Sequence, residues 1–292
     1  MKNDALTGGL LRDVSRSFYL TITWLPQEMR QGVAVAYLLA RATDSVADAS
    51  AAPLSRRVAA LQQMAAAIAG EGVDEAELMR TLRMGLAPEK ASEATLLARF
   101  DEALAAARAL PAVQLGLVRR VLAIIVQGQL WDLSFFEEHS QVLSDEQTRL
   151  YTYRVAGCVG RFWTQLGSAT LGARFCPGAT SLPELEEAGV RYGCGLQLVN
   201  ILRDREEDAR RGRSYLCSDA ALWLDRAERY LRDGLDYSRR LGSFRLRFAS
   251  MLPAILGLKT LAALRRAKPG TRVKIPRRAV YAGMLRTLIA SM

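Results

Sequence analysis

Apolar positions recur at i, i+3, i+4 and i+7 along most of the 292-residue chain, a spacing typical of amphipathic helices. Ala, Leu, Arg and Glu dominate these segments and runs of β-branched residues are rare, which favours helix over strand. Most of the prolines fall in the gaps between segments, where helices end. The pattern predicts helices at about 27–49, 54–70, 74–85, 92–109, 112–135, 145–173, 183–210, 219–241, 244–267 and 277–290.

The composition fits one large soluble domain, with 50% hydrophobic and 24% charged residues. No internal repeat or low-complexity linker divides the chain, so we predict a single all-α helical bundle over residues 1–292. No unbroken apolar run is long enough to span a membrane and the N-terminus lacks the apolar core of a signal peptide, so we expect a cytoplasmic protein. The four cysteines form no CxxC pair, which favours free buried thiols over a zinc site or disulfides.

One stripe of polar residues interrupts an otherwise apolar helix near residue 200. Gln197, Asn200, Asp204 and Asp208 are spaced by 3, 4 and 4, which places them on one helical face. Their neighbours are mainly leucine, isoleucine and valine, so the sequence predicts a buried polar row. Such a row is costly without a partner, and carboxylates with phosphate oxygens are the usual ligands of Mg²⁺.

A second stripe has a similar composition. Tyr37, Arg41, Asp44 and Asp48 are spaced by 4, 3 and 4 on another helix. Either carboxylate pair alone fits a solvated helix end with an Arg–Asp pair equally well. Two such pairs on two apolar helices favour a shared metal site.

Two weaker motifs accompany the stripes. The motif Ser15–Phe18 ends a short helical stretch before an expected turn into TITWLP, and its hydroxyls and arginine suit an anion. Gly157 and Gly160 make room in a helix for another helix or for an apolar ligand. Tyr151 faces the same space or caps the core with its hydroxyl in water. The single histidine, His139, is expected on the surface.

With these motifs in order, the sequence resembles the squalene/phytoene synthase family, the head-to-head prenyl diphosphate synthases, from Ser15 to about Tyr281. The matching segments are SRSF at 15–18, YLLARATDSVAD at 37–48, YTYRVAGCVG at 151–160 and QLVNILRDREEDARRGRSYL at 197–216. The resemblance implies an all-α bundle of the isoprenoid-synthase type, with a central apolar cavity and Mg²⁺ held between two Asp-rich helices.

The resemblance also implies a role for each matching residue. The catalytic metal ligands would be Asp44, Asp48, Asp204 and Asp208. The substrate-binding residues would be Ser15, Ser17, Phe18, Tyr37, Arg41, Gln197, Asn200, Arg203 and Arg213, with the arginines and serines on diphosphate. Tyr151 matches a tyrosine of the first half-reaction, although an ordinary phenol is protonated at neutral pH, which gives the released diphosphate at least equal weight as the base.

The activity implied is the condensation of two farnesyl diphosphates to presqualene diphosphate, followed by reduction to squalene with NADPH. Alternatives within the family are dehydrosqualene or phytoene synthesis, without reduction, and a non-catalytic assembly factor. The segments ARATDSVAD and VAGCVGRFWTQLG look closer to bacterial squalene synthases, although no motif marks an NADPH site. Two positions depart from the family: Cys217 stands where proline is usual, and Arg161 has no evident partner.

The positive charge is concentrated at the C-terminal end. Thirteen of the 40 basic residues and no acidic residue follow Asp236, which leaves 27 basic against 30 acidic residues before that point. Anionic lipid, a polyphosphorylated substrate or simple solvation would each explain this, and Tyr281 is too little aromatic surface for nucleic acid. We therefore expect prenyl diphosphate substrates, no nucleic acid, and peripheral contact with the inner face of the membrane as a hypothesis.

Overall fold

The computed structural model describes residues 9–15, 17–86, 88, 90–138, 142–217, 219–268, 273, 283, 287 and 290–291. Within these residues the chain is almost entirely helical, and the only strand-like pairing is an isolated parallel bridge between Val142 and Ser214. The predicted all-α architecture is therefore confirmed. The helices gather into two compact units, the first being Met1–Thr23 with Gln27–Phe135 and the second Trp24–Pro26 with Phe136–Met292.

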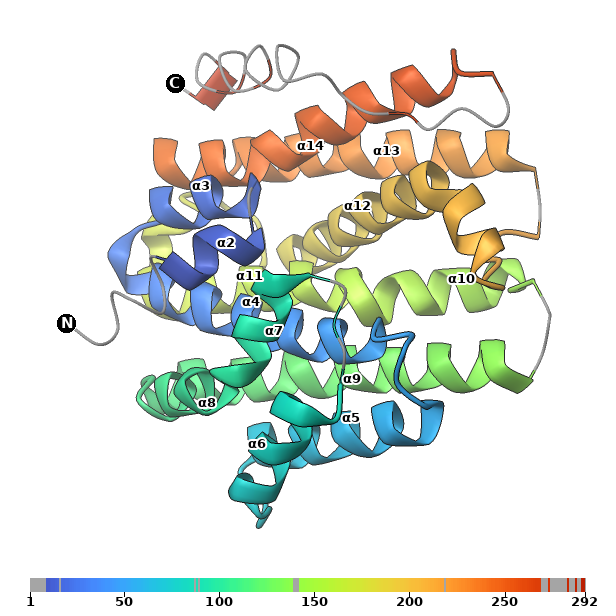
Figure 1. Ribbon diagram of the computed structural model, residues 1–292. Coiled ribbons are helices and arrows are strands. Elements are labelled where there is room, and N and C mark those ends of the chain that lie inside the picture. The colour runs from blue at the N-terminus through green and yellow to red at the C-terminus, as the bar shows by residue number, and fades with distance from the viewer. Residues whose placement is uncertain are drawn as a thin grey trace. The chain divides into compact units, whose positions relative to one another are not determined.

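The first unit is built around α4, whose buried face includes Leu38, Leu39 and Val46. This helix packs against α2, α5, α7 and α8 (Figure 1). The helices of this part are α2 (Leu11–Ser15), α3 (Ser17–Trp24), α4 (Gln27–Ala47), α5 (Leu54–Ala69), α6 (Glu75–Met84), α7 (Ala91–Ala98), α8 (Phe100–Arg108) and α9 (Ala112–Glu138), the last of which ends in the second unit.

Two expectations for this unit were wrong. The turn expected after Phe18 is absent, because α3 continues to Trp24 with the hydroxyls of Thr21 and Thr23 donating to backbone carbonyls one turn earlier. The helix expected at 92–109 is broken at Arg99, whose φ of −115° and ψ of 23° leave the helical region. That side chain instead binds the Glu102 carboxylate through two hydrogen bonds of 2.8 and 2.7 Å.

The second unit is built around α12, which packs against α10, η2, α11, α13 and α14. Both α10 and α12 begin with a capping box, formed by Ser144 with Gln147 and by Ser181 with Glu184. The elements are α10 (Asp145–Thr152), η2 (Tyr153–Gly157), α11 (Cys158–Leu171), η3 (Gly172–Arg174), α12 (Leu182–Arg210), α13 (Ala220–Arg239) and α14 (Phe244–Leu264).

Small residues bring α11 and η2 against α12 at backbone distance. A Cβ atom built on Gly189 would lie 2.7 Å from the carbonyl oxygen of Gly160 and 2.8 Å from Oγ1 of Thr164. Cβ atoms on Gly160 and Gly193 would meet backbone carbonyls of the facing helix even more closely. The neighbour for which Gly157 and Gly160 make room is therefore a helix.

The helix predicted at 145–173 is continuous, but five of its residues, Tyr153–Gly157, form a π-helical turn. Of the four thiols, Cys158 and Cys194 are buried, Cys176 is partly buried and Cys217 is exposed, so the expectation of buried thiols holds for two. His139 and most of the helix predicted at 277–290 lie outside the described residues.

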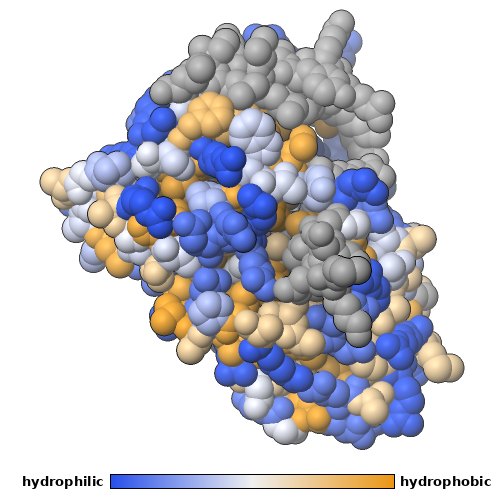
Figure 2. Space-filling view, turned by 90° about the vertical axis from the view of Figure 1, so that its left-hand side faces the viewer, coloured by the Kyte–Doolittle hydropathy of each residue, from blue (hydrophilic) through white to orange (hydrophobic). Residues whose placement is uncertain are grey.

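Two described helices are long and apolar enough to cross a membrane, although the sequence has no unbroken apolar run of that length. They are Ala112–Glu137 and Phe244–Leu264, and about half of each apolar window, 44% and 56%, is buried inside the protein. Core helices of soluble proteins meet the same criterion. On the face shown in Figure 2, hydrophobic residues lie interspersed with hydrophilic ones.

Candidate functional site

A first group of candidate residues lies in the C-terminal half of α4 and just beyond it. Arg41 donates hydrogen bonds to the carboxylate of Asp44 and, at 2.5 Å, to Oε1 of Glu93. Asp48 follows the last residue of the helix, and its backbone N–H donates to the carbonyl of Asp44 at 2.9 Å. The predicted stripe thus runs from Tyr37 in the middle of α4 to Asp48, the first residue after it.

Glu93 is a member of this cluster that the sequence did not reveal. It is 5% exposed and also accepts a hydrogen bond of 2.7 Å from Lys90. Its position 52 residues after Arg41 is set by the packing of α7 on α4. An acidic residue on the apolar face of a short helix was the only available signal.

The electrostatics of the residues around Asp44 favour a cation as ligand. Burial, and then the charge of Asp48, raise the pKa of Asp44 to about 6, although Arg41 lowers it. Burial raises the pKa of Tyr37 to about 12, so its hydroxyl is protonated at neutral pH and donates to the carbonyl of Val14 at 3.3 Å. Burial and Asp48 together therefore disfavour the charged form of Asp44, which a bound cation would favour.

The Ser15–Phe18 motif, expected to bind an anion through its hydroxyl groups, differs in part from that expectation. The buried hydroxyl of Ser15 donates to the carbonyl of Leu11 at 2.5 Å, so within the helix it already has a partner. Phe18 is 45% exposed, and its ring centroid lies 5.8 Å from that of Tyr37. The side chain of Ser17 lies outside the described part of the chain. Phe18 is thus the residue of this motif whose ring contacts Tyr37 of the α4 stripe.

A second group of candidate residues is on α12. Arg203 binds Asp204 through two hydrogen bonds, from Nε at 2.9 Å and from Nη2 at 2.5 Å. Asn200 donates to Oε1 of Gln197 at 3.4 Å. The expectation of a buried polar row was wrong: Asn200 is exposed and Asp208 is half-buried, because the stripe lies along the edge of the apolar face rather than within it.

A tight turn at the end of α12 fixes the backbone of Arg213 beside Asp208. Gly212 has a φ of +76°, its N–H donates to the carbonyl of Ala209, and the N–H of Arg213 donates to the carbonyl of Asp208 at 2.8 Å. This is the Schellman arrangement that a glycine after a helix favours. The turn therefore couples an arginine to the last aspartate of the stripe.

Tyr151 is held by aromatic packing. Its ring stacks on that of Tyr215 with centroids 4.8 Å apart, and Phe136 meets Tyr215 edge-on at 5.3 Å. The carbonyl of Tyr215 accepts a hydrogen bond of 2.5 Å from the buried hydroxyl of Thr148. A single residue separates Tyr151 from the π-turn, a feature often found at functional sites.

The two positions that depart from the expected pattern both have partners. Arg161 donates to the hydroxyl of Tyr153 at 3.0 Å and lies 3.6 Å from the carboxylate of Glu186, so the expectation that it lacks a partner was wrong. The exposed thiol of Cys217 donates to Oδ1 of Asp145 at 3.3 Å.

Whether the aspartates can bind a metal ion depends on which other ligands complete its coordination. In the described residues no group of three or more His, Cys, Asp or Glu side chains could hold a metal ion. Two carboxylates one turn apart, as at Asp44 and Asp48, are nevertheless the protein share typical of Mg²⁺ sites in which substrate phosphates supply further oxygens. The residues therefore fit Mg²⁺ bound together with a diphosphate, rather than alone.

Residues 11–222 match the model of the squalene/phytoene synthase family. The chain belongs to this family. A presqualene diphosphate synthase from Rhodopseudomonas palustris is 31% identical over 205 residues, covering 70% of this chain and 58% of the relative. A bifunctional lycopene cyclase/phytoene synthase from Colletotrichum graminicola is 30% identical over 213 residues, covering 69% and 32%.

Solved structures extend the likeness to the whole fold. TcSQS in complex with the ligand BPH1237 has a TM-score of 0.76 at 21% identity, covering 100% of this chain and 88% of that one. Squalene synthase HpnC from Alicyclobacillus acidocaldarius has a TM-score of 0.59 at 19% identity, covering 90% and 93%. The expected fold class is confirmed as an all-α squalene/phytoene synthase fold.

The matched region spans only part of the curated relatives. It covers from about a third of the bifunctional proteins to 63% of the 15-cis-phytoene synthase from Synechococcus elongatus, with which identity is 26%. Family membership and fold are thus established for this squalene/phytoene synthase-like chain, whereas its own reaction is a matter for proposal.

Proposed function

We propose that the protein joins two farnesyl diphosphates head to head, through presqualene diphosphate, and reduces the product to squalene with NADPH. The observation that carries the proposal is the pairing on α4 and α12. Each helix has two aspartates one turn apart, and in each an arginine is ion-paired to the first aspartate, Arg41 to Asp44 and Arg203 to Asp204.

Asp44 and Asp48, with Asp204 and Asp208, would hold Mg²⁺ at the diphosphate. When bound, Mg²⁺ would supply positive charge that stabilises the leaving diphosphate. Each arginine is ion-paired to the first aspartate of its pair. We infer that on substrate binding Arg41 and Arg203 turn their guanidinium groups to diphosphate oxygens, for which their donor geometry is equally suited.

The tyrosines are positioned as hydrogen-bond donors. Because the pKa of Tyr37 is raised to about 12, it would bind substrate oxygens as a neutral phenol. Tyr151, fixed against Tyr215, would orient the released diphosphate. The diphosphate would then act as the base that removes a proton, and the loss of this proton closes the cyclopropane. Apolar surroundings must exclude water here, since water would convert either carbocation into an alcohol.

A second product has a specific observation in its favour. The Rhodopseudomonas palustris relative is a presqualene diphosphate synthase, so release of presqualene diphosphate before reduction is the first alternative. Phytoene synthases among the relatives favour condensation of a longer donor without reduction. The assembly-factor alternative is disfavoured, because all four aspartates and the three arginines Arg41, Arg203 and Arg213 are present.

The products of defined substrates distinguish these reactions. Purified protein is incubated with Mg²⁺ and farnesyl or geranylgeranyl diphosphate, with and without NADPH, and the lipids are analysed by mass spectrometry. Squalene formed only with NADPH supports the proposal. Presqualene diphosphate as the sole product with NADPH present, a conjugated C30 triene regardless of NADPH, or activity restricted to geranylgeranyl diphosphate would each refute it.

The metal assignment is tested by matched substitutions in each unit. Asp44→Asn and Asp204→Asn should each lower kcat/KM for farnesyl diphosphate at least about 100-fold, because charge stabilisation in the transition state is lost. Asp101→Asn and Asp236→Asn are the controls, since these carboxylates are ion-paired to the surface arginines Arg83 and Arg239. Unchanged turnover in both stripe variants would overturn the assignment.

We also propose that the protein is cytoplasmic and contacts the inner membrane face through its basic C-terminal region. The support is the excess of thirteen basic residues after Asp236, which would attract anionic headgroups. Co-sedimentation with liposomes should require anionic lipid and should weaken as salt is raised. Binding that is independent of both would contradict this mode of attachment.

A further inference from the structure

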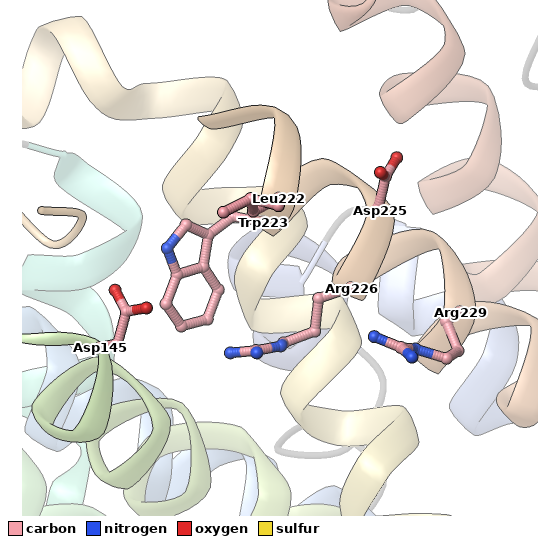
Figure 3. Close-up of a pocket in the computed structure, with 6 residues that line it drawn as sticks. All are labelled: Asp145, Leu222, Trp223, Asp225, Arg226 and Arg229. Atoms are coloured by element: carbon pink, nitrogen blue, oxygen red, sulfur yellow. The ribbon is translucent and has the colours of Figure 1, made fainter. Parts of the chain in front are cut away.

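A pocket of about 500 Å³ opens on the second unit between the first turn of α10 and the first half of α13 (Figure 3). Trp223 is 2% exposed and forms an aromatic wall, whereas Leu222 is 64% exposed. No residue of the two aspartate stripes lines it. The lining residues are Asp145, Leu222, Trp223, Asp225, Arg226 and Arg229.

Two arginines in this pocket differ from the other arginines of α13. Arg232 is paired with Glu228 at 2.6 Å and Arg239 with Asp236 at 2.5 Å. Within the described part of the chain, Arg226 and Arg229 make no ion pair or hydrogen bond, and the guanidinium of Arg226 lies 4.6 Å from the centre of the Trp223 ring. Two guanidinium groups one turn apart therefore have their donors available to a ligand.

The acidic lining residues do not cancel this charge. Asp225 accepts a hydrogen bond of 2.5 Å from Arg265, and Figure 3 shows its carboxylate turned away from the two guanidinium groups. Asp145 accepts a hydrogen bond from the Cys217 thiol and lies in the first turn of α10, where the helix dipole stabilises its charge. Of the two carboxylates that line the pocket, Asp225 is engaged by Arg265, which leaves Asp145 to oppose the two guanidinium groups.

We propose that this pocket binds a phosphate group, either inorganic phosphate or a phosphomonoester, between Arg226 and Arg229. Guanidinium groups match phosphate oxygens with parallel hydrogen bonds, and the flat face of Trp223 holds one of them in place. The exposed side chain of Leu222 lines the same pocket and would contact the organic part of an ester. The site is separate from the diphosphate site proposed above and does not depend on it.

Inorganic phosphate is the first probe, added to the full chain in EDTA so that magnesium-dependent diphosphate binding does not contribute. Isothermal titration calorimetry should show saturable binding of phosphate. Tryptophan fluorescence should report the same event, and this change should be lost in Trp223→Phe. We expect Arg229→Gln to weaken phosphate binding at least ten-fold, because it removes one of the two guanidinium groups that would bind the phosphate.

Arg239→Gln is the matched control, because Arg239 is on the same helix but paired with Asp236 and outside the pocket. Arg229 is the decisive position, since Arg226→Gln also removes the contact with Trp223. Vesicles of phosphatidate and of phosphatidylcholine identify the source of the phosphate. Binding to phosphatidate vesicles that requires Arg229, without binding of free phosphate, supports the site as one for a lipid headgroup.

Saturable phosphate binding that requires Arg229 and persists in Arg239→Gln supports the site as one for a soluble phosphate. The proposal is overturned if neither probe binds saturably, or if Arg239→Gln weakens binding as much as Arg229→Gln does. Failure of the prenyl diphosphate assay would leave this result unaffected, because the binding experiment contains neither Mg²⁺ nor prenyl substrate.

Discussion

Substitution of Gly189 by alanine tests the backbone contact between α11 and α12. The added methyl group would lie 2.7 Å from the carbonyl oxygen of Gly160 and 2.8 Å from Oγ1 of Thr164, whereas Cβ atoms hardly ever approach closer than 3.0 Å. Neither neighbour yields easily. The carbonyl is part of a helix backbone, and the Thr164 hydroxyl is bonded to Gly160 at 3.0 Å and to Tyr237 at 2.8 Å.

The free-energy change has two terms of opposite sign. Overpacking of this kind costs about 1 to 3 kcal/mol. Replacing glycine by alanine inside a helix contributes about 1 kcal/mol of stability, because the unfolded chain loses conformational freedom. Gly116→Ala in α9 has the second term alone, since a Cβ atom there meets nothing within 4 Å and the residue is exposed. The difference between the two variants therefore isolates the overpacking term.

Urea unfolding followed by circular dichroism measures this difference. We expect Gly116→Ala to stabilise the protein by up to about 1 kcal/mol, and Gly189→Ala to be about 1 to 3 kcal/mol less stable than Gly116→Ala. The dependence of the unfolding free energy on urea concentration, the m value, should be the same in both variants, so that their midpoints can be compared. A Gly189→Ala variant as stable as Gly116→Ala would refute the close helix contact.

Three further predictions concern charge, turn geometry and pH. Asp44→Asn should raise the thermal unfolding midpoint of the protein in EDTA, because it removes a charge that burial and Asp48 disfavour. The control Asp101→Asn should leave the midpoint unchanged. A lowered midpoint of Asp44→Asn in scanning fluorimetry would contradict this. Gly212→Ala should lower the free energy of unfolding in urea by about 1 kcal/mol, since φ is +76° at this position. The same substitution should lower kcat/KM by displacing Arg213. An unchanged kcat/KM would show that the turn does not position Arg213. Burial raises the pKa of Cys158 to about 12 from 9.0, so the thiol stabilises the fold fully below pH 9 and this contribution is lost as pH rises from 9 towards 12. Cys158→Ala should therefore reduce the fall in unfolding free energy over pH 9 to 11 by up to about 1.4 kcal/mol per pH unit, and an unchanged slope would disprove the assignment.

The parts of the site that the sequence predicted are those fixed by helix geometry alone. Tyr37, Arg41 and Asp44 lie along one side of α4, and Asp48 follows its last residue, because residues three and four apart in a helix are neighbours. The capping box at Ser144 is similarly local, since cap and third residue bond to each other. Short-range geometry therefore sufficed to locate the aspartates and the arginines beside them.

The parts that it missed depend on contacts between distant segments. Glu93 joins Arg41 only because α7 packs on α4, and Arg161 finds Glu186 through the packing of α11 on α12. The exposure of Asn200 could not be deduced from its apolar neighbours, because periodicity gives a direction around the helix but not the edge of the buried face. The π-turn after Tyr151 likewise has no short sequence pattern of its own.

The charges around α4 are better explained by ligand binding than by stability. Asp44, Asp48 and Glu93 place three carboxylates close to Arg41, and Glu93 is also paired with Lys90. Burial first, and then the charge of Asp48, raise the pKa of Asp44, and the ion pair with Arg41 lowers it without cancelling them. A divalent cation bound at Asp44 and Asp48 would favour the charged form of both carboxylates, and diphosphate oxygens would complete its coordination. The cluster therefore suits a cation and an anionic substrate bound together.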